Sequence, residues 1–236
     1  MEVDNLEVSY GYLQIIWGLS VKISEGEIVA MLGPNGAGKT TTLKSIMGIV
    51  PPKNGTIKFM GQDIVGKPTH LLTKMGLVFI PEERNLFSAM TVQENLLMGA
   101  YTIKDKQKIG RNLEYMYRLF PRLEERRSQL AGTMSGGERQ MLAIARGLMC
   151  NPRMVLLDEP SMGLSPENVV AVFEIIKKLR SENVTVLIVE QNVDTTLKFA
   201  DRAYVMEQGR IAMHSTSENL LRNDHVRKMY LGLAAQ

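Results

Sequence analysis

The sequence of 236 residues has a single cysteine, Cys150, so no disulfide can form within the chain. The lack of a disulfide framework is typical of proteins that work in a reducing compartment. No uninterrupted apolar run reaches the roughly 18 residues that a membrane-spanning helix needs, and the first residues, MEVDN, are acidic rather than basic. We therefore expect a cytosolic chain that meets a membrane only through another protein.

An excess of one charge is also lacking, since 28 basic residues stand against 25 acidic ones and the formal net charge is +3. Such a balance gives no global field that favours nucleic acid or an anionic membrane, so we expect no nucleic-acid partner. Long Pro/Gly/Ser linkers, internal repeats and low-complexity segments are absent as well. With 44% hydrophobic residues, the chain is expected to bury a full core as one domain.

What the sequence does contain is a set of three short apolar runs rich in β-branched residues, at 27–32 (EIVAML), 154–158 (MVLLD) and 184–190 (VTVLIVE). Runs this short, apolar on both faces and separated by helical patterns, are typical of central strands in a parallel sheet. They predict an α/β fold with a mainly parallel core sheet flanked by helices.

Two other regions differ from this core pattern. Alternating apolar residues in the first thirty positions and at 56–59 (TIKF) predict a smaller antiparallel sheet beside the parallel one, with Trp17 assigned to the core. From 91 to 129 the sequence is mostly helical in pattern and rich in charge, and it opens with a capping box formed by Thr91 and Glu94. We interpret this region as an inserted helical subdomain.

The strongest motif is GPNGAGKT at 33–40, which matches the Walker A pattern in full and lies between an apolar strand and a helical stretch at 41–47. Its glycines let backbone N–H groups turn toward phosphates, and the helix N-terminus adds a partial positive charge. Lys39 is expected to reach the terminal phosphates of ATP, and Thr40 to bind Mg²⁺. The predicted nucleotide-binding residues of this loop are Gly33, Pro34, Asn35, Gly36, Ala37, Gly38, Lys39, Thr40 and Thr41.

A second motif supplies two carboxylates at the end of the apolar run 154–158. Asp158 is the Walker B candidate and therefore the second predicted Mg²⁺ ligand. Glu159, directly after it, is placed to polarise the attacking water, because phosphoryl transfer depends mainly on positioning and charge stabilisation. Glu159 and Lys39 are thus the main catalytic candidates.

A third motif, MSGGERQ at 134–140, starts a helix with a capping box between Ser135 and Glu138 and two glycines that expose backbone donors. It resembles the signature motif of ATP-binding cassette (ABC) proteins, which follows Walker A and just precedes Walker B. The resemblance covers essentially the whole chain. It implies one P-loop NTPase cassette over 1–236, whose helical subdomain, at about 91–150, includes the signature motif.

In that family, the signature helix of one subunit faces the γ-phosphate that the Walker A loop of another subunit holds. The resemblance therefore implies that Ser135, Gly136, Gly137 and Glu138 complete a neighbour's ATP site and that the chain works as a dimer or heterodimer. Tyr10 matches the aromatic residue on which adenine stacks in the family, although a tyrosine near a strand end is also ordinary core or rim packing.

Four stretches resemble the smaller, LivF-type ATP-binding subunit of branched-chain amino acid importers: 80–87 (IPEERNLF), 119–126 (LFPRLEER), 162–166 (MGLSP) and 189–192 (VEQN). The resemblance implies ATP hydrolysis at the cytoplasmic face of the cell membrane that drives uptake through transmembrane permease subunits. A second ABC ATPase subunit and, indirectly, an extracytoplasmic solute-binding protein are the other implied partners. Import of another amino acid, an amide or urea stays open, as do a non-transport ABC ATPase and a regulatory nucleotide-binding module.

Three positions depart from the usual family pattern. Glu82 stands where most members have the Q-loop glutamine, and it is expected to hold a Mg²⁺-bound water and to take part in catalysis. Gln191 stands at the switch histidine, where its amide can donate to the γ-phosphate but cannot carry a proton. Ser165 replaces the usual aspartate of the loop after Walker B, which leaves communication between paired sites open. LivF-type subunits share the first two changes, so we interpret these as subfamily traits.

Overall fold

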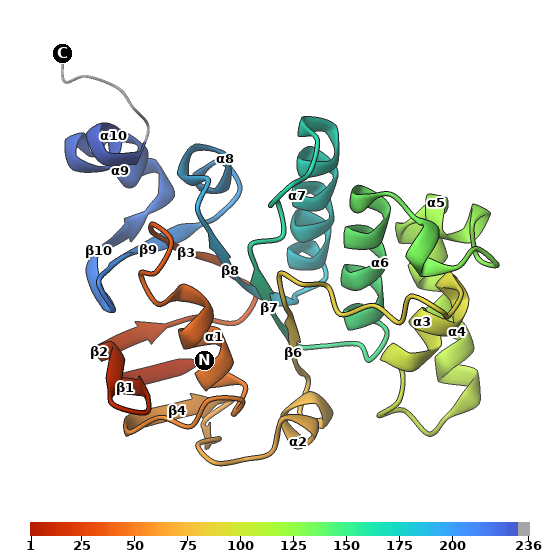
Figure 1. The fold of residues 1–236 in the computed structure, drawn as a ribbon, viewed down its shortest axis with the longest axis horizontal. Helices are drawn as coiled ribbons and strands as arrows, with labels where there is room; N and C mark the ends of the chain where they lie inside the picture. The colour runs from red at the N-terminus through yellow and green to blue at the C-terminus, as the bar shows by residue number, and fades with distance from the viewer. Residues whose placement is uncertain (231–236) are drawn as a thin grey trace.

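The three apolar runs form neighbouring parallel strands at the centre of a six-stranded sheet in the computed structural model, which describes residues 1–230 (Figure 1). The strand order in this sheet is β10-β9-β3-β8-β7-β6, and a four-stranded sheet has the order β2-β1-β4-β5. The strands are β1 (Glu2–Tyr10), β2 (Leu13–Lys22), β3 (Ile28–Leu32), β4 (Asn54–Phe59), β5 (Gln62–Asp63), β6 (Leu77–Ile80), β7 (Met154–Asp158), β8 (Thr185–Glu190), β9 (Arg202–Glu207) and β10 (Arg210–Thr216).

Helices separate most of these strands along the chain, as the alternation of strand and helix patterns predicts. They are α1 (Lys39–Ile46), α2 (Thr69–Lys74), α3 (Val92–Gly99), α4 (Lys106–Leu119), α5 (Pro121–Glu125), α6 (Gly136–Leu148), α7 (Pro166–Ser181), α8 (Val193–Leu197), α9 (Ser217–Arg222) and α10 (Asp224–Tyr230), with a 3-10 turn at Ala131–Thr133. None of the described helices combines the length and the apolar character that crossing a membrane requires.

The register of the central strands places the Walker A motif, the Walker B motif and the 189–192 stretch at one edge of the sheet. In β3, β7 and β8 every residue is buried, as expected for strands covered on both faces. Pairing is parallel, with Leu32 opposite Glu190 and Asp158 opposite Val189. The three strands therefore end side by side, and in open α/β sheets ligands bind at this carboxyl edge.

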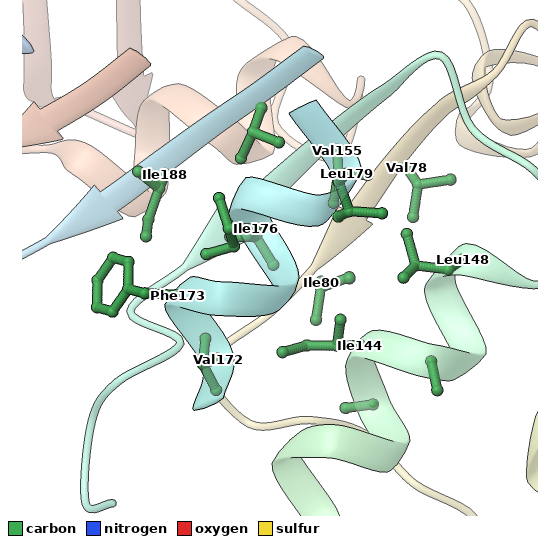
Figure 2. Packing of buried hydrophobic residues seen from close by; sticks show 14 of the residues in the cluster. Val78, Ile80, Ile144, Leu148, Val155, Val172, Phe173, Ile176, Leu179 and Ile188 are labelled. Atoms are coloured by element: carbon green, nitrogen blue, oxygen red, sulfur yellow. The ribbon is translucent and has the colours of Figure 1, made fainter. Parts of the chain in front are cut away.

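Alternation along the central strands divides the core into two layers. Ile28, Ala30 and Leu32 belong to the core on the face covered by α6 and α7, whereas Val29 and Met31 face the core shared with α1 and the antiparallel sheet. Figure 2 shows side chains of α6 and α7 lying over those of β6, β7 and β8. Burial of each such aliphatic or aromatic side chain contributes roughly 1.5–3 kcal/mol, and this packing fixes the sheet edge that carries the motifs.

The antiparallel sheet is confirmed, because β1 pairs with both β2 and β4 in antiparallel register. The assignment of Trp17 to the core is wrong, since this side chain is 42% exposed. Its neighbour Ile16 is fully buried, and consecutive residues of a strand point to opposite faces. The indole is instead covered in part by the Arg210 guanidinium, 5.7 Å from the ring centroid.

The predicted helical region is confirmed as α3, α4 and α5, which lie beyond α6 at one end of the molecule (Figure 1). Thr91 caps α3 as predicted: the Glu94 N–H donates to its hydroxyl at 3.2 Å, and its own N–H donates to the Glu94 carboxylate at 2.7 Å. Ser135 and Glu138 form the equivalent reciprocal pair at the start of α6. These local hydrogen bonds define where both helices begin.

Candidate active site

Between β3 and α1 the chain makes the turn that the GPNGAGKT motif predicts. Gly33 comes so close to β9 that a Cβ there would lie 2.2 Å from the carbonyl oxygen of Met206. Gly38, the N-cap of α1, has a φ of 102°, in the left-handed region that favours glycine. Among the described residues no side chain caps α1, and its first turn holds no acidic residue. Its first N–H groups are thus left for an anionic ligand.

Lys39 is folded back over this loop. Its ammonium donates to the carbonyl oxygens of Gly33 at 2.9 Å and Pro34 at 3.2 Å, and it lies 3.1 Å from the Glu159 carboxylate. The side chain is only 4% exposed, so its charge is directed into the loop rather than toward solvent. A buried ammonium of this kind is a strong partner for a phosphate oxygen.

The Walker A and Walker B candidates meet through one hydrogen bond, in which the Thr40 hydroxyl donates to the Asp158 carboxylate at 2.8 Å. Asp158 is buried at the end of β7. Burial is the main cause that raises the pKa of its carboxyl to about 6; the Thr40 hydrogen bond opposes this shift, and the charges of Glu159 and Glu82 add to it. Hydroxyl and carboxylate oxygens together are a donor set that suits Mg²⁺.

A hollow of about 360 Å³, which we call the phosphate-loop hollow, opens above these groups. It brings Glu82, from the segment after β6, to the same space as Glu159, from the segment after β7. Ile15 and Met162 also line it. No sequence motif pointed to Ile15, and Met162, the first residue of the 162–166 stretch, had been assigned no role in the site. The lining residues are Ile15, Asn35, Gly36, Gly38, Lys39, Thr40, Thr41, Glu82, Glu159 and Met162.

Other predicted site residues lie elsewhere in the chain. Tyr10 and Gln191 are exposed and are not among the described residues that line the phosphate-loop hollow. Ser135, Gly137 and Glu138 border a separate hollow of about 390 Å³ beside α7. Among the described residues of one copy of the chain, therefore, the signature residues and the phosphate loop line two different hollows.

Sequence reasoning missed Glu190, the last residue of β8, which is 2% exposed. Burial raises the pKa of its carboxyl, although backbone and side-chain hydrogen bonds from Ser161 oppose the shift. Glu190 could have been found from the sequence, because it is an acidic residue at the end of an apolar run, the same pattern that identified Asp158.

Comparison with known proteins shows the family. The family model for ABC transporters matches residues 16–162. The chain belongs to the ABC transporter family. The recognition made from the signature motif is confirmed, and so is the assignment of ATP-hydrolysing activity to this ABC cassette.

Several curated relatives match the ABC cassette along nearly its full length. It is 47% identical to the high-affinity branched-chain amino acid transport ATP-binding protein BraG of Pseudomonas aeruginosa, with 98% of this chain and 99% of the relative covered. Identity is 38% to the probable branched-chain amino acid transport ATP-binding protein LivF of Archaeoglobus fulgidus, covering 97% of both. It is also 38% to the lipopolysaccharide export system ATP-binding protein LptB of Escherichia coli, covering 97% of this chain and 95% of that one.

Solved structures also match the ABC cassette along nearly its full length. An ATP-binding cassette of an ABC transporter in its ADP conformation superposes with a TM-score of 0.84 at 27% identity over 98% of both chains. A nucleotide-free cassette gives a TM-score of 0.83 at 27% identity, also over 98% of both chains. The predicted fold class is thereby confirmed.

Proposed function

We propose that this cassette hydrolyses ATP to drive the uptake of branched-chain amino acids through membrane permease subunits. The relatives named for amino acid transport in Archaeoglobus and for lipopolysaccharide export in Escherichia are equally similar to it, at 38% identity. Sequence identity of 38% therefore does not distinguish between the two kinds of transported substrate. The observation that carries the proposal is the 47% identity to BraG over nearly the full length of both chains. Uptake of another amino acid, an amide or urea is the alternative.

The charges around the phosphate-loop hollow support a nucleotide that arrives with Mg²⁺. The lining of the hollow holds two carboxylates, Glu82 and Glu159, against the single ammonium of Lys39, which lies 3.1 Å from Glu159. The Asp158 carboxylate, which accepts from Thr40, lies beside this lining, so negative groups outnumber positive ones before any polyphosphate enters. Within residues 1–230, no group of three or more Asp, Glu, His or Cys side chains forms a complete metal site. This fits Mg²⁺, which is commonly held by one or two carboxylates together with phosphate oxygens.

In this proposal Thr40 and Asp158 would hold Mg²⁺, and Glu82 would assist through water. The metal would neutralise phosphate charge in the transition state. Lys39 and the first-turn N–H groups of α1 bind the terminal phosphates. Glu159, released from Lys39 by the phosphates, accepts the proton of the attacking water.

A second cassette would complete each ATP site. Ser135, Gly137 and Glu138 border a hollow of their own. The N–H groups of Ser135 and Glu138 are used in the capping box, which leaves the N–H groups of Gly136 and Gly137 and the Ser135 hydroxyl hydrogen for the nucleotide of another chain. Ser135, Gly136 and Gly137 would contact its γ-phosphate from the start of α6, and Gln191 would donate to the phosphate held in its own chain. Tyr10, at the exposed end of β1, would stack on adenine. The partner cassette would be a different chain or a second copy of this one.

An apolar groove of about 410 Å³, which we call the docking groove, supports attachment to a membrane subunit. It lies between α6, α3 and the segment after β6. Phe87 is 44% exposed there, and Met98 and Tyr101 are exposed beside it. Exposed aromatic and methionine side chains around a groove are typical of protein-binding surfaces. Such docking would hold the cassette at the cytoplasmic face of the membrane.

The docking groove continues into a basic hollow of about 670 Å³ lined by Lys74, Lys104, Lys108 and Arg153. Thr73 and Cys150 border both spaces. The carboxylate of Asp105, also in the lining, caps α4 and lies 3.9 Å from Arg111. A docking segment with apolar side chains and a flanking acidic residue fits this combination.

Purification of the cassette from membranes tests the proposal. We expect two permease subunits and a second cassette to copurify with it. The complex, reconstituted in vesicles, should transport leucine, isoleucine or valine while it hydrolyses ATP. Phe87→Ser should weaken copurification, whereas Val65→Ser, an exposed residue outside the groove, should not. Copurification with outer-envelope export components, or ATP hydrolysis stimulated by another solute, would refute the proposed cargo.

A further inference from the structure

Glu190 is a buried carboxylate to which the mechanism above gives no role. It ends β8 opposite Leu32 of β3, the residue before the phosphate loop, while its neighbour Val189 pairs with Asp158 of β7. At 2% exposure it is almost completely removed from water. A carboxylate in such a position needs hydrogen-bond donors to be tolerated.

Two backbone N–H groups from different loops are among these donors, and the Ser161 side chain adds a further one. The N–H of Ser161, in the loop after β7, donates to Oε1 of Glu190 at 2.9 Å. The N–H of Gln191, in the loop after β8, donates to Oε2 at 3.3 Å. One side chain thus links the loop that carries Glu159 to the residue at the switch position.

The loop after β7 holds Glu159 in an unusual conformation. Glu159 has a φ of 43°, in the left-handed region that non-glycine residues rarely adopt. Its N–H donates to the Val189 carbonyl at 3.0 Å, and its carbonyl accepts from the Met162 N–H at 3.1 Å. The Glu190 carboxylate holds this same turn at 2.9 Å through the Ser161 N–H, and the Arg84 guanidinium makes a longer contact, 3.5 Å, with the Met162 carbonyl. Sparsely populated backbone conformations persist only where surrounding contacts hold them.

We propose that Glu190 is a positioning residue for ATP hydrolysis, which fixes the turn carrying Glu159 and the backbone of Gln191 in one arrangement. The inference rests on the role proposed above for Glu159, and it assigns Glu190 no contact with substrate. Because Lys39, Thr40 and the α1 N-terminus bind nucleotide without Glu190, loss of its carboxylate affects turnover and spares binding.

Two variants separate this role from general stability. Glu190→Ala removes both acceptors, and Glu190→Gln keeps one oxygen for the Ser161 N–H while removing the charge. In the assembled transporter, we expect Glu190→Ala to lower kcat for phosphate release by roughly tenfold or more with KM for ATP within about twofold, the pattern for an interaction that matters in the transition state. Glu190→Gln should recover a substantial part of kcat. Glu114→Ala, an exposed carboxylate on α4, is the matched control.

Amide hydrogen exchange provides a readout that does not depend on catalysis. The 159–162 turn should exchange faster in Glu190→Ala than in the wild type or the Glu114→Ala control. Unchanged kcat in Glu190→Ala, a rise in KM that accounts for the whole loss, or unchanged exchange in the turn would each overturn the inference. Neither phosphate release nor amide exchange depends on which solute is transported. The test therefore stays valid even if the proposed transported substrate is wrong. Full turnover by Glu159→Gln would instead refute the role of Glu159.

Discussion

The ammonium of Lys39 lies 3.1 Å from the carboxylate of Glu159, and the two side chains are only 4% and 10% exposed. The lysine that is proposed to hold the terminal phosphates therefore has the proposed catalytic base as its counterion. A polyphosphate that binds Lys39 must displace this carboxylate. Binding of nucleotide and release of the base thus depend on the same buried contact.

Glu159→Gln should abolish turnover and preserve ATP binding. Loss of a general base costs about 10²–10⁴-fold in rate, and Lys39 loses a competing anion when the carboxylate becomes an amide. Phosphate release and binding of a fluorescent ATP analogue measure the two effects. Glu174→Gln, at an exposed position on α7, serves as the control. Retained turnover would show that another group activates the water.

Chelation of Mg²⁺ should weaken nucleotide binding steeply, because Glu82 and Glu159 would then face uncompensated phosphates. At an effective dielectric constant of about 20, two like charges 4 Å apart repel by about 4 kcal/mol. Glu82→Gln removes one such charge, so it should reduce the effect of chelation by about tenfold or more. Titration calorimetry with and without EDTA measures both proteins. Equal affinity of the wild type under the two conditions would contradict the prediction.

Gln191→His should leave turnover equal or higher. The side chain at 191 is exposed at the end of β8, so an imidazole can be accommodated, and it adds a group able to carry a proton. Gln191→Ala has neither the amide nor the imidazole as a hydrogen-bond donor, so its turnover should be slower than that of the wild type and of Gln191→His. Steady-state phosphate release compares the three proteins. Lost activity in the histidine variant would reveal a specific role for the glutamine amide.

Cys150 should react slowly with alkylating reagents at neutral pH. Burial raises the pKa of its thiol to about 11, so the thiolate, which is the reactive form, becomes scarcer at any pH below that value. At pH 8 the labelling rate with iodoacetamide should be on the order of a hundredfold lower than in the urea-unfolded chain, and it should rise steadily toward pH 11. Equal rates for folded and unfolded protein would show that the thiol is accessible and unperturbed.

Much of the site could be predicted from the sequence, because parallel strands bring their carboxyl ends to the same edge of the sheet. The motif ending in Asp158 and the loop around Lys39 each follow an apolar run, so their meeting follows once both runs are central strands. The exposure of Trp17 could not be predicted from the sequence in the same way. Strand register decides which face of the sheet a single aromatic residue points to. That register is set by pairing with a strand that is distant in the sequence.

The sequence by itself determined the local features: the glycine-rich turn at 33–40, the capping boxes at Thr91 and Ser135, and the short apolar runs that become the central strands. These depend on residues within a few positions of one another, where backbone geometry and hydrogen bonding act directly. Only the tertiary structure decided that Lys39 pairs with Glu159 and that Glu190 anchors the turn after β7. Those contacts join segments far apart in the chain, and their distances follow from strand register and core packing, which no local pattern encodes.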